Sequence, residues 1–311
     1  MLQPMAKLLQ TSHPWDTKES MLRYFRQRSR EFEAEISTEF GRDQIQRKAG
    51  AINKKLILAK DLIINNLQQS ATKEQWAAAN LLDKILLVNY CSYVVMLESR
   101  NAQWPYEYMS FSRRIGELWE PFCKLTFEHP VKKVELFIPP LFSDVKKNLY
   151  SEIKHYIDQL SVTPQQRKEL LKYYDKVWHL VTSGEIKLEL DLHFVHAKQK
   201  CVVDFKSGFG SNEKGNTNRL LMVATIYKNI DKSYRPIIFV RSADNNHYFR
   251  TLQKSGVWEA YESKDAYKKM SEFSGFDLSG WIQRNVKWQG DFDSAMLSHL
   301  KKSKLLQYLT W

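Results

Sequence analysis

Two aspartates and a lysine near residue 200 have the types and the spacing that metal-assisted hydrolysis requires. Asp191 is followed after twelve residues by Asp204-Phe205-Lys206. Two carboxylates that lie close together repel each other unless a cation neutralises them, and such hard oxygen ligands suit Mg²⁺. A neighbouring lysine supplies a compact positive charge that can orient or acidify a water molecule. These groups are the minimum set for hydrolysing a phosphodiester with the help of a metal.

The sequence around these residues predicts two strands that bring the three side chains together. Apolar and polar residues alternate over 186–194, which predicts a strand with Asp191 on its polar face. A polar turn separates this strand from a second one over 201–207, where Asp204 and Lys206 share a face. Two strands joined by a short turn predict a hairpin. We therefore expect an acid on one strand to lie beside an acid and a lysine on the next.

This arrangement resembles the PD-(D/E)xK nuclease core, the superfamily that includes most type II restriction endonucleases. The resemblance covers about residues 184–240, with Leu190 where the motif name has proline and Asp in place of Glu as the second acid. It implies that Asp191 and Asp204 hold a divalent metal, Mg²⁺ with Mn²⁺ as a substitute, and that Lys206 assists the attacking water. The implied fold class is α/β (α+β), a restriction-endonuclease-like mixed sheet flanked by helices.

Three further acids are candidates for the same site. Glu189 lies on the polar face of the first predicted strand, where it is either an extra metal ligand or base, or a solvated neighbour. In the family, a helix that precedes the sheet often adds one more acid. The helix predicted over 106–127 offers Glu117 and Glu120, and helical geometry favours neither.

A loop rich in glycine and asparagine follows the second strand and leads into a predicted helix over 217–229. Glycines let backbone amides approach phosphates, and the amino terminus of a helix favours anions. The side chains of Asn216, Asn218 and Arg219 are candidates for contact with DNA. The alternative is an ordinary surface loop.

Several signals outside the motif predict a chain with a helical amino-terminal part. We divide it into a helical subdomain over 1–105 that builds the DNA cleft or a dimer contact, a nuclease core over 106–285 and an extension over 286–311. The residue periodicity and the turn signals predict helices over 19–36, 47–67, 72–98 and 106–127 (interrupted or kinked at Pro121), two more between 130 and 183, strands over 237–240 and 257–261, and a helix from 264.

Composition restricts the classes of protein to which the chain can belong. The 311 residues are 43% hydrophobic with few glycines and prolines, which excludes a disordered or collagen-like chain. Lysine and arginine exceed aspartate and glutamate by 47 to 35, a formal charge of +12 that favours a polyanionic partner. Three dispersed cysteines and the absence of a signal-like amino terminus or a long enough apolar stretch predict a cytoplasmic protein that does not enter a membrane.

The sequence therefore predicts a Mg²⁺-dependent endonuclease that cuts double-stranded DNA at a short specific site, as a type II restriction enzyme does. Cutting both strands of a symmetric site requires two active sites, so we expect a homodimer. The alternatives are another PD-(D/E)xK nuclease acting on junctions, repair intermediates or mobile-element ends, and a DNA-binding protein without catalysis. Asp191, Asp204 and Lys206 would then form an ordinary cross-strand ion-pair cluster.

Overall fold

The structure is a computed structural model that describes residues 17–41, 43–181, 186–210 and 212–311. Residues 184 and 185, where the family resemblance begins, lie outside the described residues. The described chain divides into two compact units. Unit 1 is built from Met1–Lys133 and Ser263–Trp311, and unit 2 from Val134–Glu262. These units cut the chain differently from the three expected segments, because helices from both ends of the sequence pack into unit 1.

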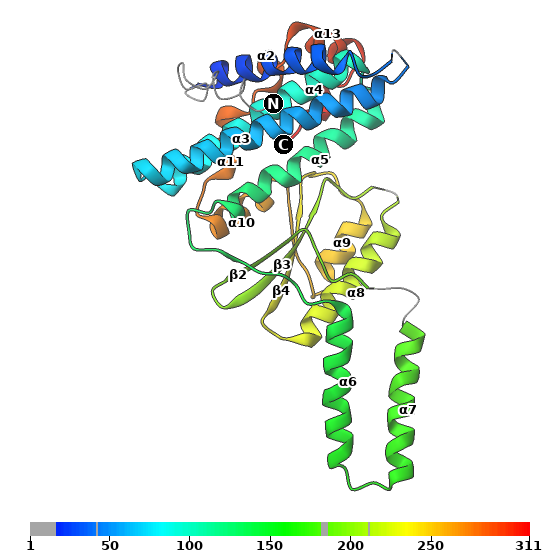
Figure 1. Ribbon diagram of the computed structural model, residues 1–311. Coiled ribbons are helices and arrows are strands. Elements are labelled where there is room, and N and C mark those ends of the chain that lie inside the picture. Colours follow the sequence, from blue (N-terminus) through cyan, green and yellow to red (C-terminus); the bar gives the residue numbers. More distant parts are fainter. Residues whose placement is uncertain (1–16, 42, 182–185, 211) are drawn as a thin grey trace. The chain divides into compact units, whose positions relative to one another are not determined.

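Unit 1 is helical, as the periodicity of the first hundred residues predicts. Its elements are α2 (Lys18–Ile36), α3 (Ile45–Glu74), α4 (Ala78–Gln103), α5 (Tyr108–Glu128), α10 (Ser263–Ser274), α11 (Leu278–Asn285), α12 (Trp288–Asp291), α13 (Ser294–Lys302) and the short 3₁₀ helix η2 (Leu306–Tyr308) (Figure 1). α5 is continuous through Pro121 rather than interrupted there. Asp291, at the end of α12, links this helix to α2 and α4. Its carboxylate accepts hydrogen bonds from Lys18 and from the buried Tyr90 hydroxyl.

α4 is the core helix of unit 1. It is long and apolar enough to cross a membrane by length and composition, yet 78% of its most apolar window is buried inside the protein. α2, α3, α5 and α13 all pack against it, so its side chains from Ile85 to Ser99 are buried on every face. The side chains of Cys91, Cys123 and Cys201 are all buried.

Among the described residues of unit 2, five strands form one mixed sheet in the order β1-β2-β3-β4-β5. The strands are β1 (Glu135–Leu136), β2 (Leu192–His196), β3 (Gln199–Lys206), β4 (Tyr234–Val240) and β5 (Glu259–Glu262). β1, β2 and β3 run antiparallel to their neighbours, whereas β3, β4 and β5 are parallel. The predicted mixed α/β class is therefore confirmed.

Two crossover helices cover one face of this sheet. α8 (Lys214–Ile230) connects β3 to β4, and α9 (His247–Lys254) connects β4 to β5, as parallel strand pairs require (Figure 1). Apolar side chains of both helices pack on Val202, Ile238 and Val240 of the sheet. The opposite side of β3 and β4 is also apolar, and Phe205 and Phe239 contact each other there with ring centroids 5.5 Å apart. β3 is buried on both faces.

A helical hairpin is inserted between β1 and β2. It consists of α6 (Phe142–Gln159) and α7 (Pro164–Val181), which lie side by side and reach away from the sheet (Figure 1). Phe142 and Val145, in the first turn of α6, are part of the core under α8. The ring of Tyr150 contacts that of Tyr174 across the hairpin.

The first strand of the predicted β2–β3 hairpin is shorter than the alternation indicates. Leu188 and Leu190 are buried and Lys187 and Glu189 exposed, so the predicted alternation of faces is present. The chain nevertheless bends at Asp191, and the paired strand covers only Leu192–His196. Alternation predicts an extended chain, but it does not reveal where that chain leaves the hydrogen-bonded ladder.

Candidate active site

The β2–β3 hairpin sets the register that brings the two predicted acids together. Ala197 and Lys198 form its two-residue turn with φ angles of 49° and 65°, and positive values at both central positions suit the right-handed twist of the strands. The register pairs Leu192 with Val203. Asp191 immediately precedes this pair, so the chain enters β2 beside the end of β3 that carries Asp204.

Asp191 is held in place by the backbone of the neighbouring strand. It occupies the bend before β2, and its Oδ2 accepts a hydrogen bond of 2.7 Å from the Phe205 N–H. An ionised carboxylate that accepts from a backbone amide forms one of the stronger hydrogen bonds of proteins. One oxygen of Asp191 is thereby committed to orienting the side chain beside Asp204.

Asp204 is the buried centre of the site. Its side chain is 3% exposed, and two cations flank it: Lys206 Nζ lies 2.9 Å from Oδ2, and Arg219 Nη2 lies 3.7 Å from Oδ1. Lys206 follows two residues later on the same strand and therefore on the same face. The structure thus brings Asp191, Asp204 and Lys206 together as the sequence predicts.

Burial dominates the ionisation of Asp204. The pKa of its carboxyl is raised from 3.8 to about 6: removal from water raises it most, the Lys206 ammonium lowers it, and the Asp191 carboxylate raises it. The two acids therefore interact electrostatically, as carboxylates in one site do. A divalent cation would relieve this repulsion and favour the ionised form.

Arg219, a candidate for contact with DNA, also lies beside the acidic site. Asn216 donates a hydrogen bond of 2.8 Å to Glu213, and Arg219 lies beside Asn216 on the first turns of α8. The guanidinium of Arg219 forms an ion pair with Asp204, and its contact with DNA stays a prediction. Sequence spacing did not reveal this pair, because the loop after β3 sets where α8 begins. Asn218 is exposed on α8.

The loop after β3 is anchored at Ser207 and at Phe209. Phe209 is buried among α8 and α9, and its N–H donates to Asn245 Oδ1. Arg241, which follows β4, donates from Nη2 to Ser207 Oγ at 2.6 Å. The carboxyl ends of the parallel strands β3 and β4 therefore carry Lys206 and Arg241 at the same edge of the sheet.

The remaining predicted acids are not drawn into this cluster by any contact that the structure shows. Glu189 is exposed, and its charge acts on Tyr227, where burial first and then Tyr234 and Glu189 raise the pKa of the phenol. Glu117 forms ion pairs with arginines on its own helix, and Glu120 does so with Lys124. α5 belongs to unit 1 and the two aspartates to unit 2.

The donor set of the site fits Mg²⁺ better than zinc. No cluster of three or more His, Cys, Asp or Glu side chains among the described residues could hold a metal by itself. Mg²⁺ commonly uses only one or two carboxylates and completes its shell with water and phosphate oxygens. Asp204 Oδ2 is buried and, within the described part of the chain, has the Lys206 ion pair but no hydrogen bond. This atom and the second oxygen of Asp191 are the ligands that the protein could offer.

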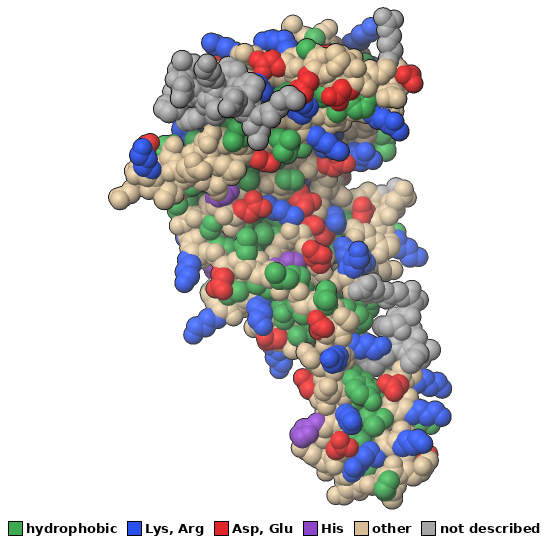
Figure 2. All heavy atoms as spheres, in the orientation of Figure 1, with side chains coloured by type: hydrophobic (Ala, Val, Ile, Leu, Met, Phe, Trp, Pro, Cys, Tyr) green, Lys and Arg blue, Asp and Glu red, His purple; other side chains and the backbone are tan. Residues whose placement is uncertain are grey.

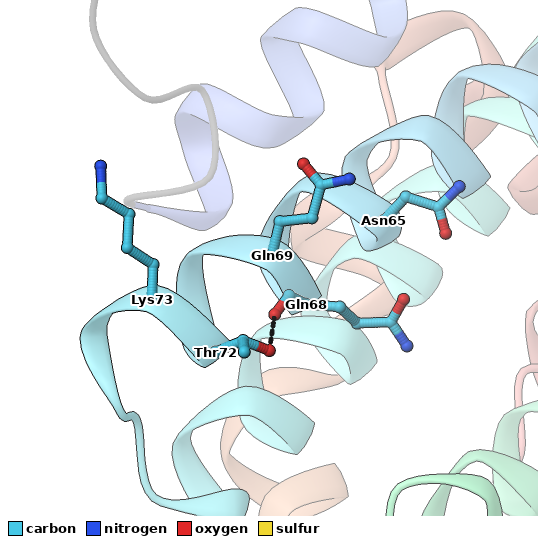
Figure 3. Close-up of a pocket in the computed structure, with 5 residues that line it drawn as sticks. All are labelled: Asn65, Gln68, Gln69, Thr72 and Lys73. Atoms are coloured by element: carbon cyan, nitrogen blue, oxygen red, sulfur yellow. Dashed lines mark hydrogen bonds between the residues drawn. The ribbon is translucent and has the colours of Figure 1, made fainter.

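A surface hollow elsewhere lacks such groups. It has a volume of about 510 Å³ and lies along α3, lined by Asn65, Gln68, Gln69, Thr72 and Lys73 (Figure 3). The Thr72 hydroxyl donates to the Gln68 carbonyl of its own helix at 2.8 Å. Amides and one lysine provide neither a metal ligand set nor a general base. The β2–β3 site is therefore the better candidate for chemistry.

We compared the chain with protein-family models, with curated proteins and with solved structures, and no match was found in any of the three.

Proposed function

We propose that this protein is a cytoplasmic, Mg²⁺-dependent endonuclease with a restriction-endonuclease-like core that cleaves double-stranded DNA at a specific short site. The observation that carries the proposal is the buried Asp204 near the end of β3, with Lys206 at 2.9 Å and the Asp191 carboxylate held beside it by the Phe205 N–H. A mixed sheet flanked by helices supports the same assignment. The formal charge of +12 is suited to a polyanionic substrate.

Each residue of the site would have a separate role in phosphodiester hydrolysis. Asp191 and Asp204 would hold the metal, which when bound neutralises phosphate charge and lowers the pKa of a coordinated water. Lys206 would orient the attacking water and stabilise the negative charge that develops on the phosphate. Water adds across one P–O bond, so that one product carries a phosphate and the other a hydroxyl. Arg219 keeps Asp204 in position through its longer ion pair.

A non-catalytic role has one observation in its favour. Lys206 and Arg219 both lie near Asp204, so the cluster is electrostatically compensated without a metal. Such a cluster could stabilise the sheet of a DNA-binding protein. Against this reading, an ion pair alone gives no reason for a second carboxylate, Asp191, directly beside a buried one, since this raises the electrostatic cost.

Incubation of the protein with phage DNA and Mg²⁺ distinguishes these possibilities. A type II enzyme yields discrete fragments, and EDTA abolishes them. A smear would instead identify a nuclease without site specificity, whereas cleavage restricted to branched or nicked substrates would favour the repair or junction reading. Intact DNA that remains bound to the protein in Mg²⁺ and in Mn²⁺ would contradict the enzymatic proposal and support the DNA-binding one.

A further inference from the structure

The helix α7 presents apolar side chains to solvent along one face. Leu170, Tyr173 and Val177 have 40%, 66% and 58% of their surface exposed. Their spacing of three and four residues places them in a row along the helix. We call these three residues the α7 stripe. Figure 2 shows apolar side chains among basic ones on the hairpin that α7 forms with α6.

The stripe is distinct from the side of α7 that packs on α6. Arg167 donates to the Asp158 carbonyl at the end of α6, and Tyr174 contacts Tyr150. Arg167, Leu171 and Tyr174 therefore mark the α6 side of the helix. At about 100° per residue, the α7 stripe lies roughly a quarter turn away from them. α6 thus packs on one face of α7, and a second face that carries apolar side chains stays exposed.

Charge favours a protein over a nucleic acid as the partner of this face. α6 and α7 together carry seven Lys and Arg residues against five Asp and Glu residues, a small excess for a segment that would bind a polyanion. The stripe is flanked on the side away from α6 by one residue of each sign, Glu169 and Lys176. An interface of mixed charge and exposed apolar side chains is typical of protein contacts.

The arrangement is complementary to itself. When two such helices pack antiparallel about a two-fold axis, Leu170 of one lies against Tyr173 of the other, and the reverse. The same register brings Glu169 of each copy beside Lys176 of the second copy, because residues flanking an antiparallel seam pair in this way. One symmetric contact then forms two Leu170–Tyr173 contacts and two Glu169–Lys176 ion pairs.

We infer that the α7 stripe is the surface through which two copies of this chain form a dimer. The inference rests on the proposed function only in that cutting both strands of a symmetric site calls for two active sites. The apolar part is short, so the contact belongs to the smaller, concentration-dependent class of interfaces. Dimerisation in the micromolar range is the expected behaviour.

Sedimentation equilibrium without DNA or metal tests the inference through the weight-average mass of the full chain. The wild type should approach twice 36.8 kDa at tens of micromolar, and Leu170→Glu with Val177→Glu should remain at 36.8 kDa. Glu169→Lys and Lys176→Glu should each weaken dimerisation by about tenfold, because each creates two like-charge contacts. The double charge reversal should restore it. Lys168→Glu, a matched change on α7 away from the stripe, should have no effect.

Circular dichroism checks that the variants are folded, which is expected because the changed side chains are exposed. A wild type that stays monomeric, a dimer that resists the stripe variants, or a double reversal that fails to restore it would each overturn the inference. Mass and DNA cleavage are separate readouts. Absence of cleavage by a dimeric wild type would count against the proposed nuclease, whereas a monomeric wild type that still cleaves DNA would count against the dimer contact alone.

Discussion

At the scale of single residues, the ionisation of Asp204 affects both the proposed chemistry of the site and the stability of the protein. Its side chain is 3% exposed, and Lys206 and Arg219 offset the loss of hydration only in part, since the pKa is still raised to about 6. A residue that is costly to keep charged and lies beside another carboxylate is suited to bind a cation. Two predictions follow from this electrostatic situation.

The first concerns stability in the absence of metal. Between pH 4 and pH 6 the folded protein retains the Asp204 proton while the unfolded chain loses it, so the stability contributed by this group falls as pH rises through that window. Asp204→Asn removes the buried charge. We expect the variant to be more stable than the wild type by about 1–2 kcal/mol at pH 8, partly offset by the unpaired Lys206, and to lose this advantage at pH 4.

Urea unfolding of both proteins at the two pH values measures this difference. Asp244→Asn, at an exposed position, serves as the control and should show no such dependence on pH. A wild type that is more stable than Asp204→Asn at pH 8 would show that the ion pairs outweigh the cost of burial.

The second residue-scale prediction concerns the pH dependence of cleavage. A proton and Mg²⁺ compete for the same oxygens of Asp204, whose pKa is about 6. At low Mg²⁺ the cleavage rate should fall about tenfold for each pH unit below 6, and raising the Mg²⁺ concentration should move the midpoint to lower pH. Initial rates on a plasmid substrate at several metal concentrations provide the measurement. A midpoint that does not respond to Mg²⁺ would separate Asp204 from metal binding.

At the scale of elements, the β2–β3 hairpin positions the site through its turn. Lys198 adopts a φ of 65°, a left-handed conformation that costs a residue with a Cβ about 1–2 kcal/mol. Glycine at the second position relieves this cost, although it loses more entropy on folding. We predict that Lys198→Gly stabilises the protein by about 0.5–1 kcal/mol in thermal unfolding.

Lys200→Gly is the comparison for this change. It lies two residues further on, in paired strand, and its ammonium forms an ion pair with Asp231 at 3.3 Å. Glycine there should destabilise the protein, since it weakens the strand and removes that pair. If both glycine variants destabilise to a similar degree, the turn does not carry the strain that its φ angles imply.

The elements were largely predictable from local pattern, while their junctions were not. Thr72-Lys-Glu-Gln was expected to start a helix, yet these residues end α3, where Gln75 has a φ of 54°, and α4 begins at Ala78. A capping pattern describes local hydrogen bonding and does not show which side of it is helical. The three principal site residues came from strand alternation and register. Arg219 did not, because its ion pair depends on where the loop places α8.

At the scale of the whole molecule, long-range packing was the part that the sequence could not reveal. α10 to α13 join the amino-terminal helices in unit 1, although more than a hundred residues separate them along the chain. Amphipathic patterns predict that each helix buries a face, but they do not identify the partner. α4 illustrates the point, since its apolar surface on all sides is explained only by the helices that surround it.

The net charge of the whole molecule favours DNA as the substrate of the proposed active site. A formal charge of +12 spread over both units gives general attraction to DNA, and many basic groups share the phosphate contacts. Loss of one lysine should therefore weaken DNA binding only slightly. If replacing Lys206 lowers the cleavage rate strongly but changes the affinity for DNA little, Lys206 acts in the chemical step.

Cleavage of plasmid DNA in Mg²⁺ by Lys206→Ala, compared with binding of the same DNA in Ca²⁺, tests the central claim most directly. We predict that this variant cleaves at least about a hundredfold more slowly than the wild type while its affinity changes by less than about threefold, and that Asp204→Asn does not cleave. Lys198→Ala, which removes a lysine from the turn of the same hairpin, should cleave normally. A Lys206→Ala protein that cleaves at the wild-type rate, or a wild type that cleaves in EDTA, would contradict the assignment of this site.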